Sequence, residues 1–123
     1  MPNNPSNSNH NESKELVEKI VTWCKEKKAV NILSINLQGI SLIGDYFLLL
    51  TVSNARQGQA LTDYLKEQLK ELGKEVLRTE GYDEARWILL DCGEVIIHIF
   101  QDEERKYYNL ERLWGDAPIE NYF

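Results

Sequence analysis

Residues 87–100, WILLDCGEVIIHIF, decide how this chain folds. Two apolar runs flank Cys92-Gly93, a pattern typical of a β-hairpin with a two-residue turn. With that turn, the predicted cross-strand pairs are Asp91–Glu94, Leu89–Ile96 and Trp87–His98. Polar and aromatic residues among the apolar ones indicate that one side of the hairpin is only partly covered.

The predicted hairpin has two faces of different character, because side chains alternate along a strand. The uncharged face, predicted to be core, holds Ile88, Leu90, Cys92, Val95, Ile97 and Ile99. The other face holds Trp87, Leu89, Asp91, Glu94, Ile96, His98 and Phe100. If half-exposed, an aromatic centre with an acidic end is suited to a protein partner. The residues leave an alternative open, in which a helix covers this face and His98 is a satisfied core histidine.

Length and composition indicate a single domain with a substantial core, at 123 residues. The formal net charge is -6, from 20 acidic and 14 basic residues. This balance argues against nucleic acid as the main contact and is compatible with a basic protein surface. Cys24 and Cys92 form no CxxC or metal-ligand spacing, so we expect two reduced thiols.

The first twelve residues are polar and are predicted to be a disordered tail, with one domain over residues 13–123. They contain no cationic apolar signal, and the longest apolar runs are too short to cross a bilayer. We therefore expect a cytoplasmic protein without membrane contact.

The remaining pattern predicts an α/β (α+β) fold in the order α-β-β-α-β-β-β-α. Ser13 is the expected N-cap of the first helix, and Ser53 or Asn54 caps a second helix that reaches about Leu72. Strands are predicted at 31–37, 45–52 and from Lys74, before the hairpin, and a last helix from near Asp102. Residues 116–123 are expected to be irregular. The result would be a mixed five-stranded sheet flanked by helices.

Motifs for catalysis are missing from the sequence. It contains no GxGxxG, GxxxxGK[ST], HExxH or GxSxG pattern. Cys92 and His98 would point to opposite hairpin faces, which argues against a thiol–base pair. A small nucleotidyl- or phosphotransferase that uses Asp45 and Asp91 with Mg²⁺ stays open as an alternative.

The chain resembles the ribosomal silencing factors, also called Iojap-like proteins, over about Leu16 to Trp114. The residues that carry this resemblance are Lys28, Ala29, Asp45, Tyr46, Phe47, Thr51, Ser53, Arg56, Gln57, Glu80, Gly81, Trp87, Asp91, Gly93, His98, Phe100, Arg105, Tyr108, Leu110, Glu111, Leu113 and Trp114. Cys92 in the turn departs from the family pattern, as does the polar tail.

The resemblance implies a nucleotidyltransferase-like fold without the catalytic acidic cluster, so neither enzyme activity nor a cofactor is expected. It implies binding to the large ribosomal subunit through the basic ribosomal protein uL14, which would block joining of the small subunit and repress translation. A role in ribosome biogenesis, a homodimer of the free protein and little direct RNA contact are further implications.

We expect the partner-binding residues on the mixed hairpin face and the following helix. They are Trp87, Leu89, Asp91, His98, Phe100, Tyr108, Glu111 and Trp114. At helical spacing, Trp114 could instead pack on the sheet. A dimeric scaffold without a ribosomal role is a further alternative.

Overall fold

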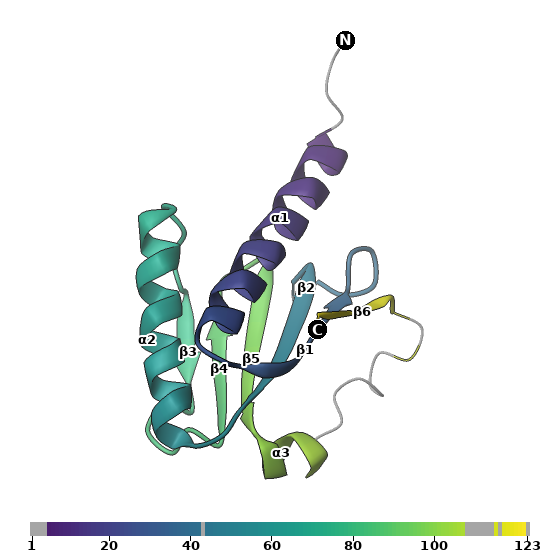
Figure 1. Ribbon diagram of the computed structural model, residues 1–123. Helices are drawn as coiled ribbons and strands as arrows, with labels where there is room; N and C mark the ends of the chain where they lie inside the picture. The colour runs from purple at the N-terminus through teal and green to yellow at the C-terminus, as the bar shows by residue number, and fades with distance from the viewer. Residues whose placement is uncertain (1–4, 43, 108–114, 116, 123) are drawn as a thin grey trace.

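The computed structural model describes residues 5–42, 44–107, 115 and 117–122, and one mixed sheet dominates it (Figure 1). The elements in chain order are α1 (Pro5–Glu26), β1 (Val30–Asn36), β2 (Tyr46–Val52), α2 (Ala55–Glu71), β3 (Arg78–Glu80), β4 (Trp87–Asp91), β5 (Val95–Gln101), α3 (Asp102–Tyr107) and β6 (Ile119–Tyr122). This is the predicted class and order of elements, with one strand added at the end.

The sheet has six strands in the order β3-β4-β5-β2-β1-β6, rather than the predicted five. β2 and β5 are parallel neighbours at its centre, and all other pairs are antiparallel. The additional strand is β6, which pairs with β1 where an irregular end was expected. Its four residues are mostly exposed, as on an edge strand, so they lack the apolar alternation that would have predicted it.

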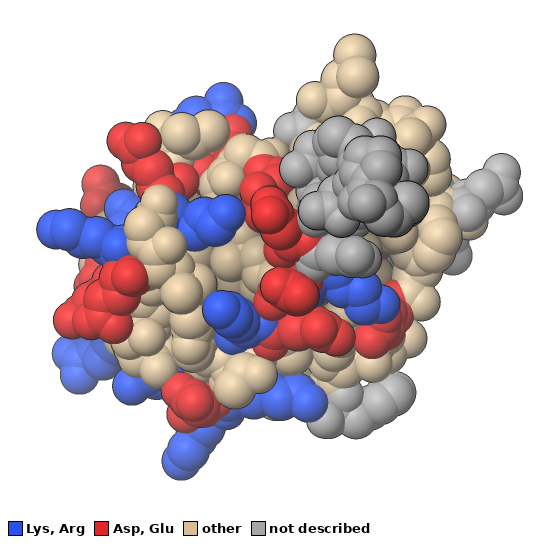
Figure 2. Space-filling model, turned by 90° about the horizontal axis from the view of Figure 1, so that it is seen from above, with Lys and Arg blue, Asp and Glu red and all other residues tan. Residues whose placement is uncertain are grey.

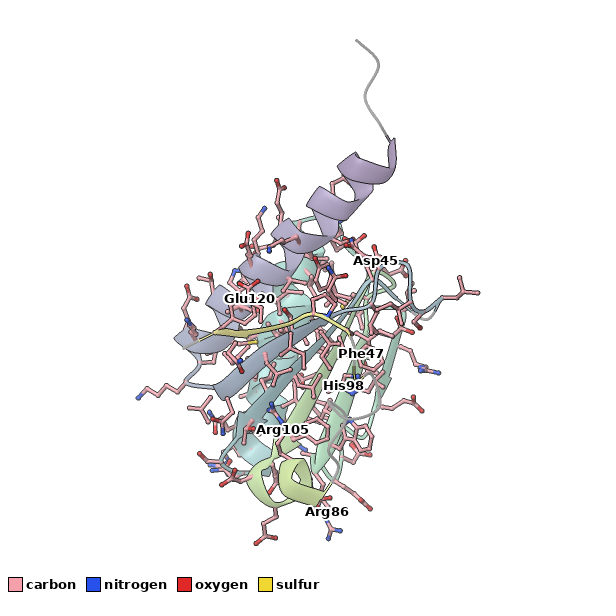
Figure 3. The ribbon with its side chains drawn as sticks, turned by 90° about the vertical axis from the view of Figure 1, so that its right-hand side faces the viewer. Asp45, Phe47, Arg86, His98, Arg105 and Glu120 are labelled. Carbon is pink, nitrogen blue, oxygen red and sulfur yellow. The ribbon has the colours of Figure 1, made fainter. Side chains whose placement is uncertain are left out.

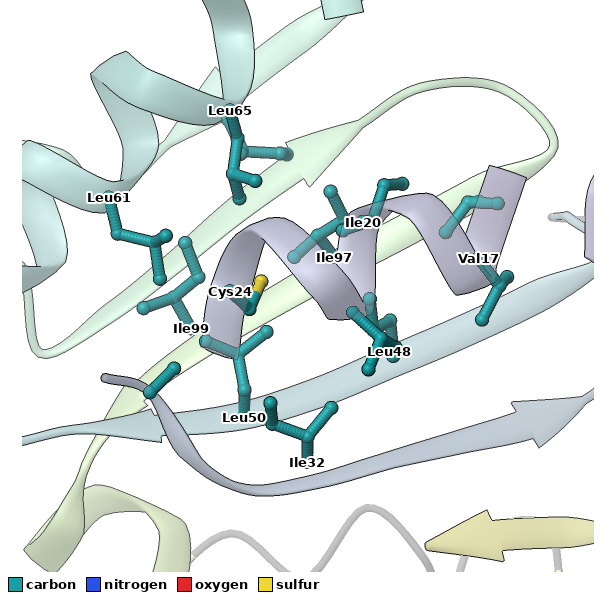
Figure 4. Packing of buried hydrophobic residues seen from close by; sticks show 14 of the residues in the cluster. Val17, Ile20, Cys24, Ile32, Leu48, Leu50, Leu61, Leu65, Ile97 and Ile99 are labelled. Carbon is teal, nitrogen blue, oxygen red and sulfur yellow. The ribbon is translucent and has the colours of Figure 1, made fainter. Parts of the chain in front are cut away.

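Helices α1 and α2 cover one face of the sheet and enclose the main core (Figures 1 and 4). The apolar stripe of α1, from Leu16 to Cys24, packs there against β2 and β5. β2 confirms the strand predicted at 45–52, and every one of its residues is buried, as in a strand covered on both faces.

The start of α1 differs from the prediction. The helix begins at Pro5, within the expected tail, and Ser13 lies inside it rather than at its N-cap. The Ser13 hydroxyl is buried and donates to Asp45 Oδ2 at 2.7 Å, so a tertiary hydrogen bond uses the group that was predicted to cap the helix.

The hairpin turn also differs, being formed by Gly93-Glu94 and not by Cys92-Gly93. The amide of Cys92 donates to the Val95 carbonyl, and Asp91 lies opposite Ile96. The reason is local. The first turn residue, Gly93, has a φ of 83°, which glycine adopts readily. The register therefore moves by two residues, which keeps every side chain of the two strands on its predicted face.

Asn54 caps α2, as predicted. Its side chain accepts from the Gln57 amide at 2.8 Å, while Gln57 Oε1 accepts from the Ser53 amide. These contacts satisfy donors that the first helical turn leaves unpaired. The helix N-terminus is therefore occupied by ordinary capping.

Replacing Asn54 with alanine should lower the free energy of unfolding by about 1 kcal/mol, because the Gln57 amide loses its acceptor. Chemical denaturation would measure this change. The matched control is Arg56→Ala, an exposed residue in the same helical turn, which should leave stability nearly unchanged. Equal effects of both substitutions would contradict the capping role.

Candidate functional site

The mixed face of the hairpin lies on the side of the sheet opposite α1 and α2. There it joins a second apolar cluster, to which Trp87 and Leu89 of β4 and Ile96 and Phe100 of β5 belong. The cluster extends across the sheet to Phe47, Leu49, Leu33, Ile35, Leu37 and Ala117. We call Trp87, Leu89 and Asp91 of β4, with His98 and Phe100 beside them on β5, the aromatic face.

Side chains of the aromatic face form a compact group of rings. The Trp87 ring centroid lies 5.0 Å from that of Phe100 and 5.9 Å from that of His98. Phe47 adds a fourth ring, 4.7 Å from His98, and Figure 3 shows these two side chains together on β2 and β5. Tilted rings at such distances attract through their quadrupoles.

His98 is almost fully buried, at 3% exposure, and is held by a specific hydrogen bond. The Trp87 indole Nε1–H donates to His98 Nδ1 at 3.0 Å. Since Nδ1 accepts, the neutral imidazole carries its proton on Nε2. In the described part of the chain, Nε2 is buried without a hydrogen-bond partner. Burial among apolar groups lowers the pKa of His98 from 6.5 to about 4.

The low pKa of His98 predicts a stability loss on mild acidification. The unfolded chain takes up a proton on His98 near pH 6.5 and the folded chain only near pH 4, so stability falls as the pH drops through this window. Between pH 7.5 and 5 the expected loss is about 2 kcal/mol. Denaturation at both pH values would measure it. Because His98→Phe removes the titrating group, it should show a smaller pH effect; equal losses in both proteins would disprove this origin.

The β4 residues of this face are partly exposed, in contrast to those of β5. Trp87, Leu89 and Asp91 are half-buried, whereas His98 and Phe100 are buried. Asp91 Oδ1 accepts from the Gly93 amide at 2.9 Å, so this carboxylate stabilises the turn. The sequence-predicted residues Tyr108, Glu111 and Trp114 lie outside the described residues. The accessible part of the aromatic face is therefore the row on β4.

Two residues outside the predicted site organise its surroundings. The sequence placed Phe47 in a strand and among the residues of the family resemblance but not in the site, and the parallel pairing of β2 with β5 brings it against His98. Arg105 of α3 donates through Nη1 to the Asn31 carbonyl at 2.9 Å and to Thr51 Oγ1 at 3.1 Å, which fixes α3 to β1 and β2. The sequence could have placed Phe47 in the site only if it had shown that β2 is the parallel neighbour of β5.

The residues considered for chemistry have structural roles. Cys92 packs against the main core, away from His98, and burial raises the pKa of its thiol to about 12. Asp45 accepts from Ser13, and Asp91 from the turn amide. Among the described residues, no three His, Cys, Asp or Glu side chains are grouped as metal ligands.

Comparison with known proteins places this chain in a family. A family model described as "Ribosomal silencing factor during starvation" matches residues 10–122. The chain belongs to this family. It is 45% identical to the ribosomal silencing factor RsfS of Bacillus subtilis over 106 residues, which are 86% of this chain and 90% of that protein. A crystal structure from Bacillus halodurans superposes with a TM-score of 0.78 at 41% identity, over 89% of this chain and 99% of that one.

A more distant relative is the mouse protein named mitochondrial assembly of ribosomal large subunit protein 1. It is 27% identical over 113 residues, which are 89% of this chain and 50% of that protein. The names of these silencing factors describe regulation rather than catalysis.

Positive and negative side chains are mixed on the face of the molecule shown in Figure 2. On the side shown in Figure 2, Lys and Arg side chains are interspersed with Asp and Glu instead of forming one basic patch. Within the described ranges, none of the helices has the length and apolar character needed to cross a membrane.

Proposed function

We propose that this protein binds the large ribosomal subunit through ribosomal protein uL14 and thereby blocks association with the small subunit, which represses translation. Family membership supports the ribosomal role, and the relative named for large-subunit assembly favours that subunit. The observation that carries the proposal is the half-exposed row Trp87, Leu89 and Asp91 on strand β4.

This row has the chemistry of a protein-binding site. Trp87 offers a large aromatic surface whose indole is hydrogen-bonded to His98 of the neighbouring strand, and Leu89 extends the apolar area. Asp91 adds a carboxylate at the edge, which suits a basic partner such as uL14. The net charge of -6 works in the same direction, because it favours approach to a basic surface.

Several further properties are part of the same proposal. The protein acts by binding and not as an enzyme, with little direct RNA contact and no cofactor, and in the cytoplasm, where subunits meet. Residues 13–123 act as one domain, and Tyr108, Glu111 and Trp114 belong to the same interface. The free protein forms a homodimer through this face, and binding also assists large-subunit maturation.

Sedimentation of purified ribosomal subunits through a sucrose gradient, with and without the protein, tests this function. The expected result is migration of the protein with the large subunit and a fall in intact ribosomes. If the protein stays at the top while intact ribosomes form normally, the proposal is wrong. Addition of isolated uL14 as a competitor tests the partner, since it should release the protein from the subunit.

A further inference from the structure

His98 is a buried member of the aromatic face and is joined to Trp87 across the hairpin. Across the hairpin, Leu89 lies opposite His98 and Trp87 lies opposite Phe100, so Trp87 and His98 are diagonal neighbours. At this spacing long aromatic side chains still meet, and Trp87 Nε1 reaches His98 Nδ1 at 3.0 Å.

Both ring nitrogens of His98 are closed to an incoming protein. Nδ1 already accepts the indole proton, and Nε2 is buried without contact to solvent. The ring itself is enclosed, with the Phe47 centroid at 4.7 Å and the Phe100 centroid at 6.2 Å. Direct recognition by His98 would require this group of rings to open.

We propose that His98 is a positioning residue, whose Nδ1 lone pair fixes the indole of Trp87 in the orientation that binds the partner protein. This inference rests on the proposed function, because it assigns the partner contact to Trp87. It also moves His98 from the group of contact residues, where the sequence placed it, to the buried residues that support them from the neighbouring strand.

The physical advantage lies in preorganisation. A half-exposed indole can adopt several rotamers, and ordering such a side chain on binding costs about 0.5–1.5 kcal/mol. A buried acceptor removes most of this cost in advance, because the N–H···N bond forms in only one ring orientation. A phenylalanine at position 98 would fill similar space but would offer no acceptor.

The hydrogen bond can be observed directly by NMR on the free, ¹⁵N-labelled full chain. We expect a through-hydrogen-bond nitrogen–nitrogen coupling between Trp87 Nε1 and His98 Nδ1, and a histidine tautomer protonated on Nε2. The Trp87→Phe variant assigns the indole signal among the three tryptophans of the chain. Absence of the coupling, or a proton on Nδ1, would overturn the inference.

Binding to purified large subunits then tests the consequence. His98→Phe should bind about tenfold more weakly, as expected for the loss of one hydrogen bond that orders a contact residue. His98→Asn, which keeps an acceptor near the position of Nδ1, should recover part of the affinity even though it packs less well. Ile96→Val is the matched control, because it loosens the same face of β5 without touching the bond and should bind like the wild type.

A double-mutant comparison separates positioning from direct contact. In a Trp87→Ala background, His98→Phe should have no further effect on binding, because the group that it positions is gone. Additive losses would overturn the proposal, as would normal binding by His98→Phe. Failure of the wild-type protein to bind the subunit would instead overturn the proposed function.

Discussion

Replacing Trp87 with alanine is expected to weaken binding to the large ribosomal subunit by at least about 30-fold, which corresponds to a hot-spot loss of about 2 kcal/mol or more. Trp87 is the largest partly exposed side chain of the aromatic face, and its indole is held by His98. A rigid aromatic group of this kind loses little entropy on binding, so its contact area is converted efficiently into affinity. Titration of large subunits with labelled protein would measure the change.

The control for Trp87→Ala has to separate binding from stability, because Trp87 also packs on Phe100. Trp23→Ala serves this purpose, since Trp23 is partly buried against the main core on the helix-covered side of the sheet. Both variants should lose stability, and only Trp87→Ala should lose binding. Comparable losses of affinity in the two variants would show that the aromatic face is not the contact surface.

The hairpin shows how much of the site could be predicted from the sequence. Alternation of side chains assigned each residue of β4 and β5 to its correct face although the turn was wrong, because a shift of two residues preserves the alternation. The prediction failed on the identity of the turn residues, Gly93-Glu94. Backbone conformation at one glycine decided that point, and apolar patterning carries no information about it.

Burial on the aromatic face could not be predicted in the same way. The sequence left open whether this face is half-exposed or covered. In the structure, its β4 residues are half-exposed and its β5 residues are buried. β4 has one strand between it and the sheet edge, and its side chains on this face stay half-exposed, whereas β5 is central and its residues His98 and Phe100 are buried. That difference depends on strand order and on Phe47 across the parallel pair, which are non-local properties.

The ends of the chain were the weakest part of the fold prediction for a related reason. β6 forms by pairing with the outer edge of β1. Ser13 donates a hydrogen bond to Asp45, which is 32 residues away in the sequence. The local sequence around β6 and Ser13 does not reveal these partners, β1 and Asp45. In contrast, the part of α1 after Ser13, the strand β2 and the cap of α2 depend on local patterns, and the sequence predicted all three.

Gly81 follows β3 and lies against the backbone of Trp87. Replacing Gly81 with alanine should lower the free energy of unfolding by about 4 kcal/mol, more than any other glycine-to-alanine change beside the aromatic face. Gly81 has a φ of 78°, which costs alanine about 1–2 kcal/mol, and the added Cβ would overlap the carbonyl oxygen of Trp87. That oxygen belongs to the backbone and cannot turn aside, so β4 itself would have to shift. Chemical denaturation would measure the loss, and the Trp87 indole NMR signal should move.

Gly73→Ala is the matched control for this prediction. Gly73 has nearly the same φ, 76°, but an added Cβ there meets no atom within 4 Å. Gly73→Ala should therefore show only the backbone strain, about 1–2 kcal/mol, and leave the Trp87 signal in place. Similar stability losses in the two variants would mean that β4 yields easily to the added methyl group. The aromatic face would then lack the rigid support on which preorganisation of Trp87 depends, because the same backbone that excludes a Cβ at Gly81 holds Trp87 beside His98.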